Sequence, residues 1–377
     1  MSNVFTAIQP TLFSAARKIA NEPFGIVTAI NADFDDKGVA KGDTVTVDVA
    51  PTRTASNFTP ANVPASGTDA TASGIGVTIT KSRKVDWNLT GEQARSLDNA
   101  TIKSDWVEQM IMQGMRTLRN ECEVDAALAV KVGASRAYGT AGTTPFASDL
   151  SVLTNARKIL QDNGAPLADL QFVGDTNCGL NLRNLGIIQQ AYQAGSDQER
   201  RSGKFLRQFG FEINESAGIG LHTKGTGTSY TSDTTGYAVG STSITLITGS
   251  GTVVAGDVVT FAGDTNKYVV KTGVAAPGVI VLQDPGLKVA LAASAVAMTI
   301  GNNFTANLAF ERSAVVGVMR PPIMPENPTI QQTLISDPYG MTYLLLDIAQ
   351  YGQRSWELHL AWGFQAVNGM FAATVLG

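Results

Sequence analysis

Two histidines and two cysteines are the side chains of this chain best suited to catalysis or metal binding. They are His222, His359, Cys122 and Cys178, and the 377-residue sequence contains no others. Hydrolytic catalysis needs a base beside a nucleophile, and structural zinc sites are usually built from four His or Cys ligands. This stock is too small and too dispersed for either. We therefore expect no catalytic residue, no metal and no cofactor.

The local pattern around each of these four residues favours a structural role. Cys122 lies in a helical pattern and Cys178 follows an Asp-Thr-Asn turn, so both are predicted to be free thiols. His359 alternates onto the polar side of a strand beside Glu357, which predicts a solvated or interfacial histidine. His222 precedes a segment rich in Thr and Gly, which favours a histidine in a linker.

Glycine-rich and acidic motifs were weighed as signs of an enzyme. Residues 218–220 and 225–227 read Gly-x-Gly but lack the third glycine and the strand-to-helix context of a dinucleotide site. Residues 202–204, Ser-Gly-Lys, lack the other parts of a phosphate loop. Asp35 and Asp36 lie in a predicted turn, where Asp is favoured for local hydrogen bonds. An enzyme is not supported by any of these motifs.

Composition and charge limit the partners that this chain can have. The net charge is −4, which gives no overall electrostatic reason to bind nucleic acid or an anionic membrane. Charged residues make up 16%, against about 25% in ordinary soluble domains, so other protein is expected to cover much of the surface. No apolar window approaches the ~20 residues of a membrane span, and no signal peptide is recognised, so we expect a cytoplasmic protein.

One dense cluster of positive charge occurs near the middle of the chain. Its members are Arg200, Arg201, Lys204 and Arg207. Aromatic residues do not alternate with these charges, as they do in many single-strand-binding surfaces. A solvated loop or a contact between subunits is therefore favoured over nucleic-acid binding.

The first half of the sequence predicts a helix, a long loop between strands, and a long helix. Apolar residues at helical spacing predict a helix over 12–20, and alternation predicts strands over 44–51 and 75–90. The polar stretch 52–74 between them is too long for a tight hairpin and predicts a protruding loop. The strongest helical pattern covers 101–134, which corresponds to a rod of roughly 45 Å.

The second half predicts an α/β region, an inserted β module and a closing sheet. The α/β region consists of a helix over 148–164, a strand over 170–174 and a helix over 178–186. Residues 223–302 contain no His, Cys, Glu, Arg or Trp, and their alternating runs predict a small barrel or sandwich. These runs are 237–239, 243–247, 257–261, 268–272, 279–282 and 297–300. The closing strands are predicted over 307–319, 341–351 and 356–364, with 369–377 continuing the sheet.

This order of segments resembles that of tailed-bacteriophage major capsid (coat) proteins with the Hong Kong-97-type fold. It resembles most the short-tailed Salmonella podophage branch, whose coat carries an inserted β-barrel domain. The strings that suggest this branch are Leu221-His222-Thr223-Lys224 at the module entry, TSITL and GDVVTFAG within it, and NNFTANLAFERSAVVGVMRPP after it. The module is shorter than is usual in that branch.

The resemblance implies an α+β fold divided into the parts of a capsid subunit. These parts are an N-terminal arm (1–31), an extended β-hairpin loop with its strands (32–92), a spine helix in the peripheral domain (93–147), an axial domain (148–222), the inserted β-barrel domain (223–302) and return strands that complete the axial and peripheral domains (303–377).

The resemblance also implies the function and the partners. Copies of the chain would form pentamers and hexamers of an icosahedral shell, assembled in the host cytoplasm with scaffolding and portal proteins. The shell would enclose double-stranded DNA without sequence-specific binding, and a decoration protein is a further possible partner; no membrane is involved. The expected contacts between subunits are Phe5, Phe13, Arg17, Arg53, Phe58, Arg200, Arg201, Lys204, Arg207, Asp264 and Lys267. The alternatives are a decoration or surface protein and, less favoured, an α/β enzyme with a β accessory domain.

Overall fold

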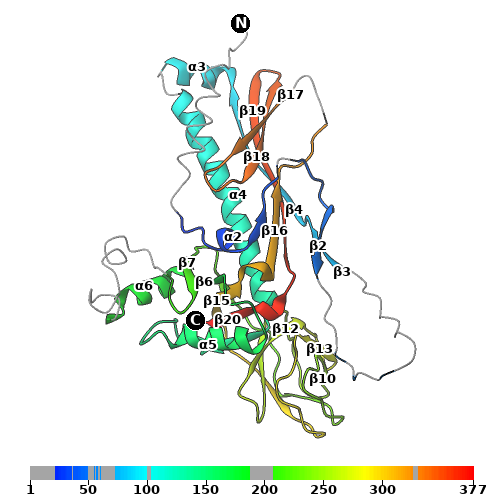
Figure 1. The fold of residues 1–377 in the computed structure, drawn as a ribbon. Helices are drawn as coiled ribbons and strands as arrows, with labels where there is room; N and C mark the ends of the chain where they lie inside the picture. The colour runs from blue at the N-terminus through cyan, green and yellow to red at the C-terminus, as the bar shows by residue number, and fades with distance from the viewer. Residues whose placement is uncertain are drawn as a thin grey trace.

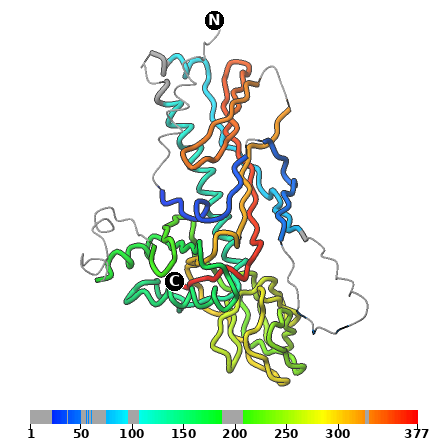
Figure 2. Tube along the Cα trace, in the orientation of Figure 1, coloured from blue at the N-terminus to red at the C-terminus, as the bar shows by residue number. Residues whose placement is uncertain are grey.

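The computed structural model describes residues 22–35, 37–49, 55, 57, 60, 73–99, 103–186, 207–325 and 330–377. In this part of the chain, helices and strands form an elongated α+β body arranged along one long helix (Figure 1). One sheet packs along that helix and a second sheet crosses its C-terminal end. A group of short strands forms a further lobe beyond the second sheet, drawn in yellow and green in Figure 2.

The long helix is α4, Lys103–Gly133, and it has the extent that the apolar periodicity predicts. Its buried positions recur every three or four residues and form one continuous stripe. They are Val107, Ile111, Met115, Leu118, Cys122, Ala126 and Val130. This stripe packs on the first sheet and gives the largest core cluster of the described chain. A shorter helix, α3 (Gly91–Asn99), precedes it.

The first sheet has six strands and is built around one long central strand. The strand order is β1-β16-β19-β18-β17, and β4 pairs with the other side of β19. The bounds are β1 (Asn31–Asp33), β4 (Lys81–Thr90), β16 (Val315–Arg320), β17 (Ile330–Ser336), β18 (Thr342–Gln350) and β19 (Gln353–Ala366). The antiparallel pair β18–β19 confirms the predicted closing pair.

The prediction that β19 is half-buried is wrong. Residues 358–363 are buried on both faces of the sheet, because α4 covers one face and β3 (Ser73–Thr78) packs near the other. The Trp362 indole Nε1 donates a 2.8 Å hydrogen bond to Asp125 Oδ2 on α4, which holds the helix to the strand. Alternation alone could not reveal the second covering layer.

The prediction of one strand over 307–319, with the final residues in the same closing sheet, is also wrong. The chain forms β15 (Phe304–Glu311), a short 3-10 turn at Arg312–Ala314, and then β16 in the other sheet. Glu311 caps the turn by accepting the amide hydrogen of Ser313 at 3.0 Å. The last strand, β20 (Ala372–Leu376), pairs with β15 and not with β19. The turn therefore transfers the chain between the two sheets.

The second sheet has the order β7-β6-β15-β20-β5 and carries two helices. The bounds are β5 (Arg136–Gly139), β6 (Leu170–Gly174), β7 (Phe211–Glu215), α5 (Ser151–Asp162) and α6 (Thr176–Asn184). The strand β6 agrees with its prediction, and the predicted helices are present with shifted ends. Asp175 fixes the start of α6, because its carboxylate accepts the amide hydrogen of Cys178 at 2.9 Å.

Residues 223–302, called the inserted segment from here on, contain six short strands around a separate apolar core. They are β9 (Tyr230–Thr231), β10 (Ser243–Thr245), β11 (Val258–Phe261), β12 (Lys267–Thr272), β13 (Val279–Leu282) and β14 (Ala297–Ile300). The run predicted over 237–239 makes only one bridge, from Tyr237 to Leu291. The strand order is β9-β14-β11-β12-β13-β10, and the residues just after β10 bond to the chain around β9, since the Ile247 amide donates to the carbonyl oxygen of Thr231 at 3.0 Å and Ser232 forms a bridge with Leu246.

The inserted segment enters and leaves the body at one place. Its entry strand β8 (Leu221–His222) pairs with β15, so His222 lies opposite Phe304. It is also joined to the second sheet, because β12 pairs with β5 through Lys267 opposite Ala137 and Tyr268 opposite Arg136. The segment has its own core, but its hydrogen bonding continues into the body.

A two-stranded ribbon projects from the first sheet. It consists of β2 (Thr44–Val49) and β3, paired antiparallel from Thr44 opposite Thr78 to Val49 opposite Ser73. Val77 and Ile79 at one end are buried against Val316 and Val318. Farther out, the described residues of β2 alternate between exposed and half-exposed. The loop predicted over 52–74 lies almost entirely outside the described residues. The single strand predicted over 75–90 is wrong, because the chain forms β3 in this ribbon and then β4 in the first sheet (Figure 1).

Candidate functional site

The residues predicted to contact other subunits are only partly within the described chain. Phe5, Phe13, Arg17, Arg53, Phe58, Arg200, Arg201 and Lys204 lie outside the described residues. Arg207, Asp264 and Lys267 lie within them. Arg207 precedes β7 at one edge of the second sheet, whereas Lys267 begins β12 beyond β5 at the other edge. The structure therefore does not bring Arg207 together with the other two residues.

Arg207 forms an ion pair within its own chain. Its guanidinium lies 3.4 Å from Asp169 Oδ1, and Arg312 Nε lies 3.3 Å from Asp169 Oδ2. The side chain of Arg207 is 55% exposed, so this pair is screened by solvent and contributes little to stability. A contact between Arg207 and a second subunit stays a prediction.

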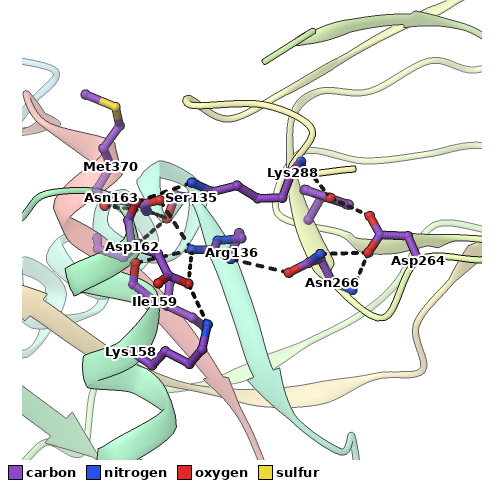
Figure 3. Close-up of polar contacts among 12 residues, drawn as sticks. Ser135, Arg136, Lys158, Ile159, Asp162, Asn163, Asp264, Asn266, Lys288 and Met370 are labelled. Carbon is purple, nitrogen blue, oxygen red and sulfur yellow. Dashed lines mark hydrogen bonds and ion pairs between the residues drawn. The ribbon is translucent and has the colours of Figure 1, made fainter. Parts of the chain in front are cut away.

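Asp264 lies at a polar junction between the inserted segment and the second sheet (Figure 3). Lys267 lies at the same junction, because it pairs with Ala137 of β5. The centre of this junction is Arg136 on β5, which is only 5% exposed. Its guanidinium donates to Asn266 Oδ1 at 3.3 Å and to the carbonyl oxygen of Ile159 at 3.3 Å. Arg136 thus connects the turn between β11 and β12 to the helix α5.

The C-terminal end of α5 completes the junction. Arg136 also contacts Asp162 Oδ2 at 3.5 Å and Asn163 Oδ1 at 3.3 Å. Asn163 in turn donates to Ser135 Oγ at 2.9 Å and to the carbonyl oxygen of Met370 at 2.8 Å. These bonds join the end of α5 to Arg136 on β5, to Ser135 just before β5 and to Met370 just before β20.

Carboxylates on each side of the junction are already hydrogen-bonded. Lys158 donates to Asp162 at 2.7 Å and lowers the pKa of that carboxyl group. Asp264 accepts from the backbone and side chain of Asn266 and, at 2.5 Å, from the Tyr268 hydroxyl. Burial and the Asp264 carboxylate raise the pKa of Tyr268 to about 12, so its hydroxyl remains protonated at neutral pH.

A second buried polar group links the inserted segment to the long helix. His222 Nε2 lies 2.9 Å from Asp257 Oδ1, and Lys131 Nζ on α4 lies 3.2 Å from His222 Nδ1. Asp257 also accepts the amide hydrogens of Val254 at 2.8 Å and Gly225 at 3.1 Å. His222, predicted as a linker histidine, is therefore a buried part of the joint. Burial lowers the pKa of Lys131.

The N-terminal described segment is held to α4 by charged residues that sequence reasoning did not identify as a site. Glu123 is 2% exposed and accepts the amide hydrogens of Ile26 (2.7 Å) and Val27 (3.1 Å), the first residues of α2 (Ile26–Ala29). Burial raises the pKa of this carboxyl group. Arg119, one turn earlier, is fully buried and lies over the ring of Phe24 at 4.9 Å. Both charges adjoin the apolar stripe of α4, which is the one sequence signal that could have found them.

The two cysteines and two histidines, the side chains best suited to catalysis, are all buried, and both histidines are hydrogen-bonded within the subunit. Cys122 and Cys178 are buried free thiols, as predicted, and burial raises the pKa of both. The prediction for His359 is corrected, since this side chain is buried and bonds to Glu357 Oε2 at 2.9 Å. Lys84 on β4 donates to the same carboxylate at 2.6 Å and occupies the solvent side. In the part of the chain that the structure describes, no group of three His, Cys, Asp or Glu side chains is placed to hold a metal ion.

Large apolar side chains are exposed on several separate elements. They occur on α4, α6, β8, β17, the β18–β19 turn and the inserted segment, and they include Val124, Leu128, Leu180, Leu221, Val239, Leu334 and Tyr351. Val124 and Leu128 are four residues apart and therefore lie on one side of α4. None of the described helices is both long and apolar enough to cross a membrane.

The comparisons with known proteins found likenesses among solved structures only. No protein-family model and no curated protein sequence matches the chain. The chain is similar to a structure from Mycobacterium phage Che8 (13% identity, TM-score 0.49, covering 89% of this chain and 85% of that one). It is also similar to the capsid of the cyanophage P-SCSP1u (11%, 0.48, 95% and 89%) and to a virus-like particle from Pyrococcus furiosus (7%, 0.46, 98% and 98%).

Proposed function

We propose that this protein is a major capsid protein that forms an icosahedral shell around a phage genome. The observation that carries the proposal is the projecting ribbon β2–β3. An isolated two-stranded ribbon is at best marginally stable in water. This one is anchored in the core by Val77 and Ile79, against which Val45 and Val47 of β2 also pack, and its far end projects from the first sheet. A neighbouring subunit would supply the missing surface. The long spine helix and the order of segments along the chain agree with this role.

The exposed apolar residues support the same proposal from a different direction. A protein that buries several faces in an assembly needs apolar side chains on each face and few charges. The charged fraction of 16% and the exposed apolar side chains on α4, α6 and β17 fit that expectation. The two thiols are buried, and each histidine is bonded to a carboxylate, His222 to Asp257 and His359 to Glu357; these contacts agree with a structural role.

The proposal includes the division into capsid parts. Residues 1–31 would form an arm, 32–92 the extended loop, 93–147 the spine, 148–222 the axial domain, 223–302 the inserted domain and 303–377 the return strands. The six strands β9 to β14 would form a barrel, which the hydrogen bond from Ile247, just after β10, to Thr231 of β9 would help to close. Pentamers and hexamers, scaffolding and portal partners, and enclosed double-stranded DNA belong to the same proposal.

Electron microscopy and sedimentation of the full chain test this function. The protein would be expressed alone and together with the neighbouring genes of its source. Closed shells tens of nanometres across are expected in at least one preparation. A chain that stays monomeric in both would contradict the proposal and favour the decoration-protein alternative.

A further inference from the structure

A cationic pocket lies beside the junction between the inserted segment and the second sheet. Its volume is about 330 Å³, and it lies between β5, α5 and the turn that joins β11 to β12. The residues that line it include the three cations Arg136, Lys158 and Lys267, together with the amides of Asn155 and Asn266. None of these lining residues is an Asp or a Glu. Figure 3 shows Arg136 and Lys158 with their polar partners in this region.

The charge of Arg136 is only partly compensated inside the chain. Its four hydrogen bonds are 3.3 to 3.5 Å long, and only one of them goes to a carboxylate, that of Asp162. Within the described residues, Arg136 Nε is buried without a hydrogen-bond partner. Asp162 is shared, because Lys158 Nζ approaches it more closely, at 2.7 Å. A buried guanidinium with long, shared contacts leaves a positive potential in its surroundings.

Lys267 adds a second half-buried charge at the pocket wall. Its ammonium group donates to the carbonyl oxygen of Gly139, and burial lowers its pKa. The nearest acidic residue along its turn is Asp264, whose carboxylate already accepts from Asn266 and Tyr268. An anion in the pocket would restore the hydration energy that the ammonium group loses on burial.

The local balance of charge favours a ligand that is itself negative. Lys288 also points to this region and donates to the main-chain oxygen of Asp162 at 3.3 Å. Arg136, Lys158, Lys267 and Lys288 supply four positive charges, and Asp162 and Asp264 supply two negative ones. The three cations that line the pocket, Arg136, Lys158 and Lys267, come from β5, α5 and β12. A ligand with several acceptor oxygens could contact two or more of them at once.

We propose that this pocket binds a phosphate group. Arginine and lysine together are the usual partners of phosphate in proteins, since the guanidinium donates in a fixed fork and the ammonium acts as a point charge. The phosphate is either a free ion or a group of a DNA backbone, which present the same charged oxygens. The inference concerns the single subunit and does not depend on shell assembly.

Calorimetric titration of the full-length chain with sodium phosphate, at constant ionic strength maintained with sodium chloride, tests the site. Lys267→Gln and Lys158→Gln each remove one lining charge, and Lys158 is exposed, so its replacement preserves the fold. The matched control is Lys271→Gln. Lys271 is exposed and lies on β12, as Lys267 does, but it does not line this pocket. We expect each pocket variant to weaken phosphate binding by about tenfold or more, as loss of one charge-assisted bond predicts, and the control to bind as wild type does.

Competition with a short DNA duplex separates the two sources of phosphate. A duplex that displaces phosphate from the wild type, and not from Lys267→Gln, places a backbone phosphate in the pocket. A duplex that does not compete leaves the free ion as the ligand. Absence of phosphate binding by the wild type, or equal affinities of Lys267→Gln and Lys271→Gln, would overturn the proposal.

Discussion

The backbone amide of Ile26 donates a 2.7 Å hydrogen bond to Oε1 of Glu123, a residue 97 positions later in the chain. The second oxygen of the same carboxylate accepts from Val27 at 3.1 Å. One buried side chain of α4 therefore caps the first turn of α2. The path of the N-terminal segment across the body depends on this carboxylate.

Replacement of Glu123 by alanine is expected to destabilise the subunit strongly. The amides of Ile26 and Val27 would remain buried without acceptors, at about 1–3 kcal/mol each. We expect the free energy of unfolding to fall by about 2–5 kcal/mol, measured by chemical denaturation. The control is Glu121→Ala on the same helix, whose carboxylate pairs with Arg83 at the surface. Equal losses in the two variants would contradict this role of Glu123.

The pH dependence of stability should reveal the burial of Glu123. Burial raises its pKa above the ordinary value of 4.5, so the native state binds the proton more tightly than the unfolded state. The stability that the neutral carboxyl provides is complete below pH 4.5 and is lost as the pH rises through the raised pKa. The glutamine of Glu123→Gln does not titrate, so the unfolding free energy of the wild type minus that of the variant should decrease as the pH rises from 4.5 through the raised pKa. A difference that grows with pH would refute the raised pKa.

Asp257 should stabilise the contact between the inserted segment and α4. Its carboxylate accepts from Gly225 and contacts His222 in buried bonds, and it accepts from Val254 in a partly buried bond. Asp257→Ala is expected to cost about 2–4 kcal/mol, because several buried donors lose their acceptor. Asp48→Ala on the exposed side of β2 is the control and should lie within about 0.5 kcal/mol of wild type. Thermal unfolding measures both.

The projecting ribbon should matter for assembly and not for the fold of the subunit. Val49 lies on the half-exposed side of β2 at the end away from the core, and Thr46 lies on the opposite, exposed side. Val49→Asp is expected to leave the subunit folded and to abolish closed shells, because it places a charge on the surface that a neighbour would cover. Thr46→Asp is the matched control, and shells are counted by electron microscopy. Equal yields of shells from Val49→Asp and Thr46→Asp would argue against a subunit contact on the Val49 side of β2.

Removal of the inserted segment should impair the body to which it is hydrogen-bonded. A variant that replaces residues 226–301 with a short Gly-Ser linker would expose the edge of β5 and remove Asn266 from Arg136. An unpaired strand edge favours aggregation. We therefore expect a large loss of soluble protein, measured by sedimentation of the lysate. Wild-type solubility of this variant would show that the segment is dispensable for folding.

The sequence patterns predicted elements better than they predicted contacts. The helix over 101–134 and the strand over 170–174 were predictable because periodicity and flanking turns depend on neighbouring residues alone. The assignment of β15 and β16 to two sheets was not, since it depends on a three-residue turn capped by Glu311. The burial of His359 was not predictable from alternation either; the imidazole bonds to Glu357 of the same strand, and Lys84 on β4 donates to that carboxylate.

The candidate site was predictable only in its outermost residues. The resemblance to capsid proteins led to Asp264 and Lys267 as contacts between subunits; Asp264 lies in the turn between β11 and β12 and Lys267 begins β12, whereas their contact with another subunit stays a prediction. Arg136, the buried centre of the junction, occurs in the sequence as a single cation after a helix, with no motif around it. Its partners come from α5 and from the inserted segment, more than 20 and 120 positions away. Such a junction is defined by tertiary packing and leaves no local pattern.

The pairing of β19 with β4 has a consequence for the rate of folding. Although β19 pairs locally with β18, its other edge must pair with β4 from a distant part of the chain, with Gln353 opposite Thr90. The strands β11 and β12 of the inserted segment are sequence neighbours, with Val258 opposite Val269. Formation of distant pairs is slow because a long loop must close before any bond forms. The amides of β11 and β12 are therefore expected to acquire protection from hydrogen exchange earlier during refolding than those in the β4–β19 pair of the first sheet.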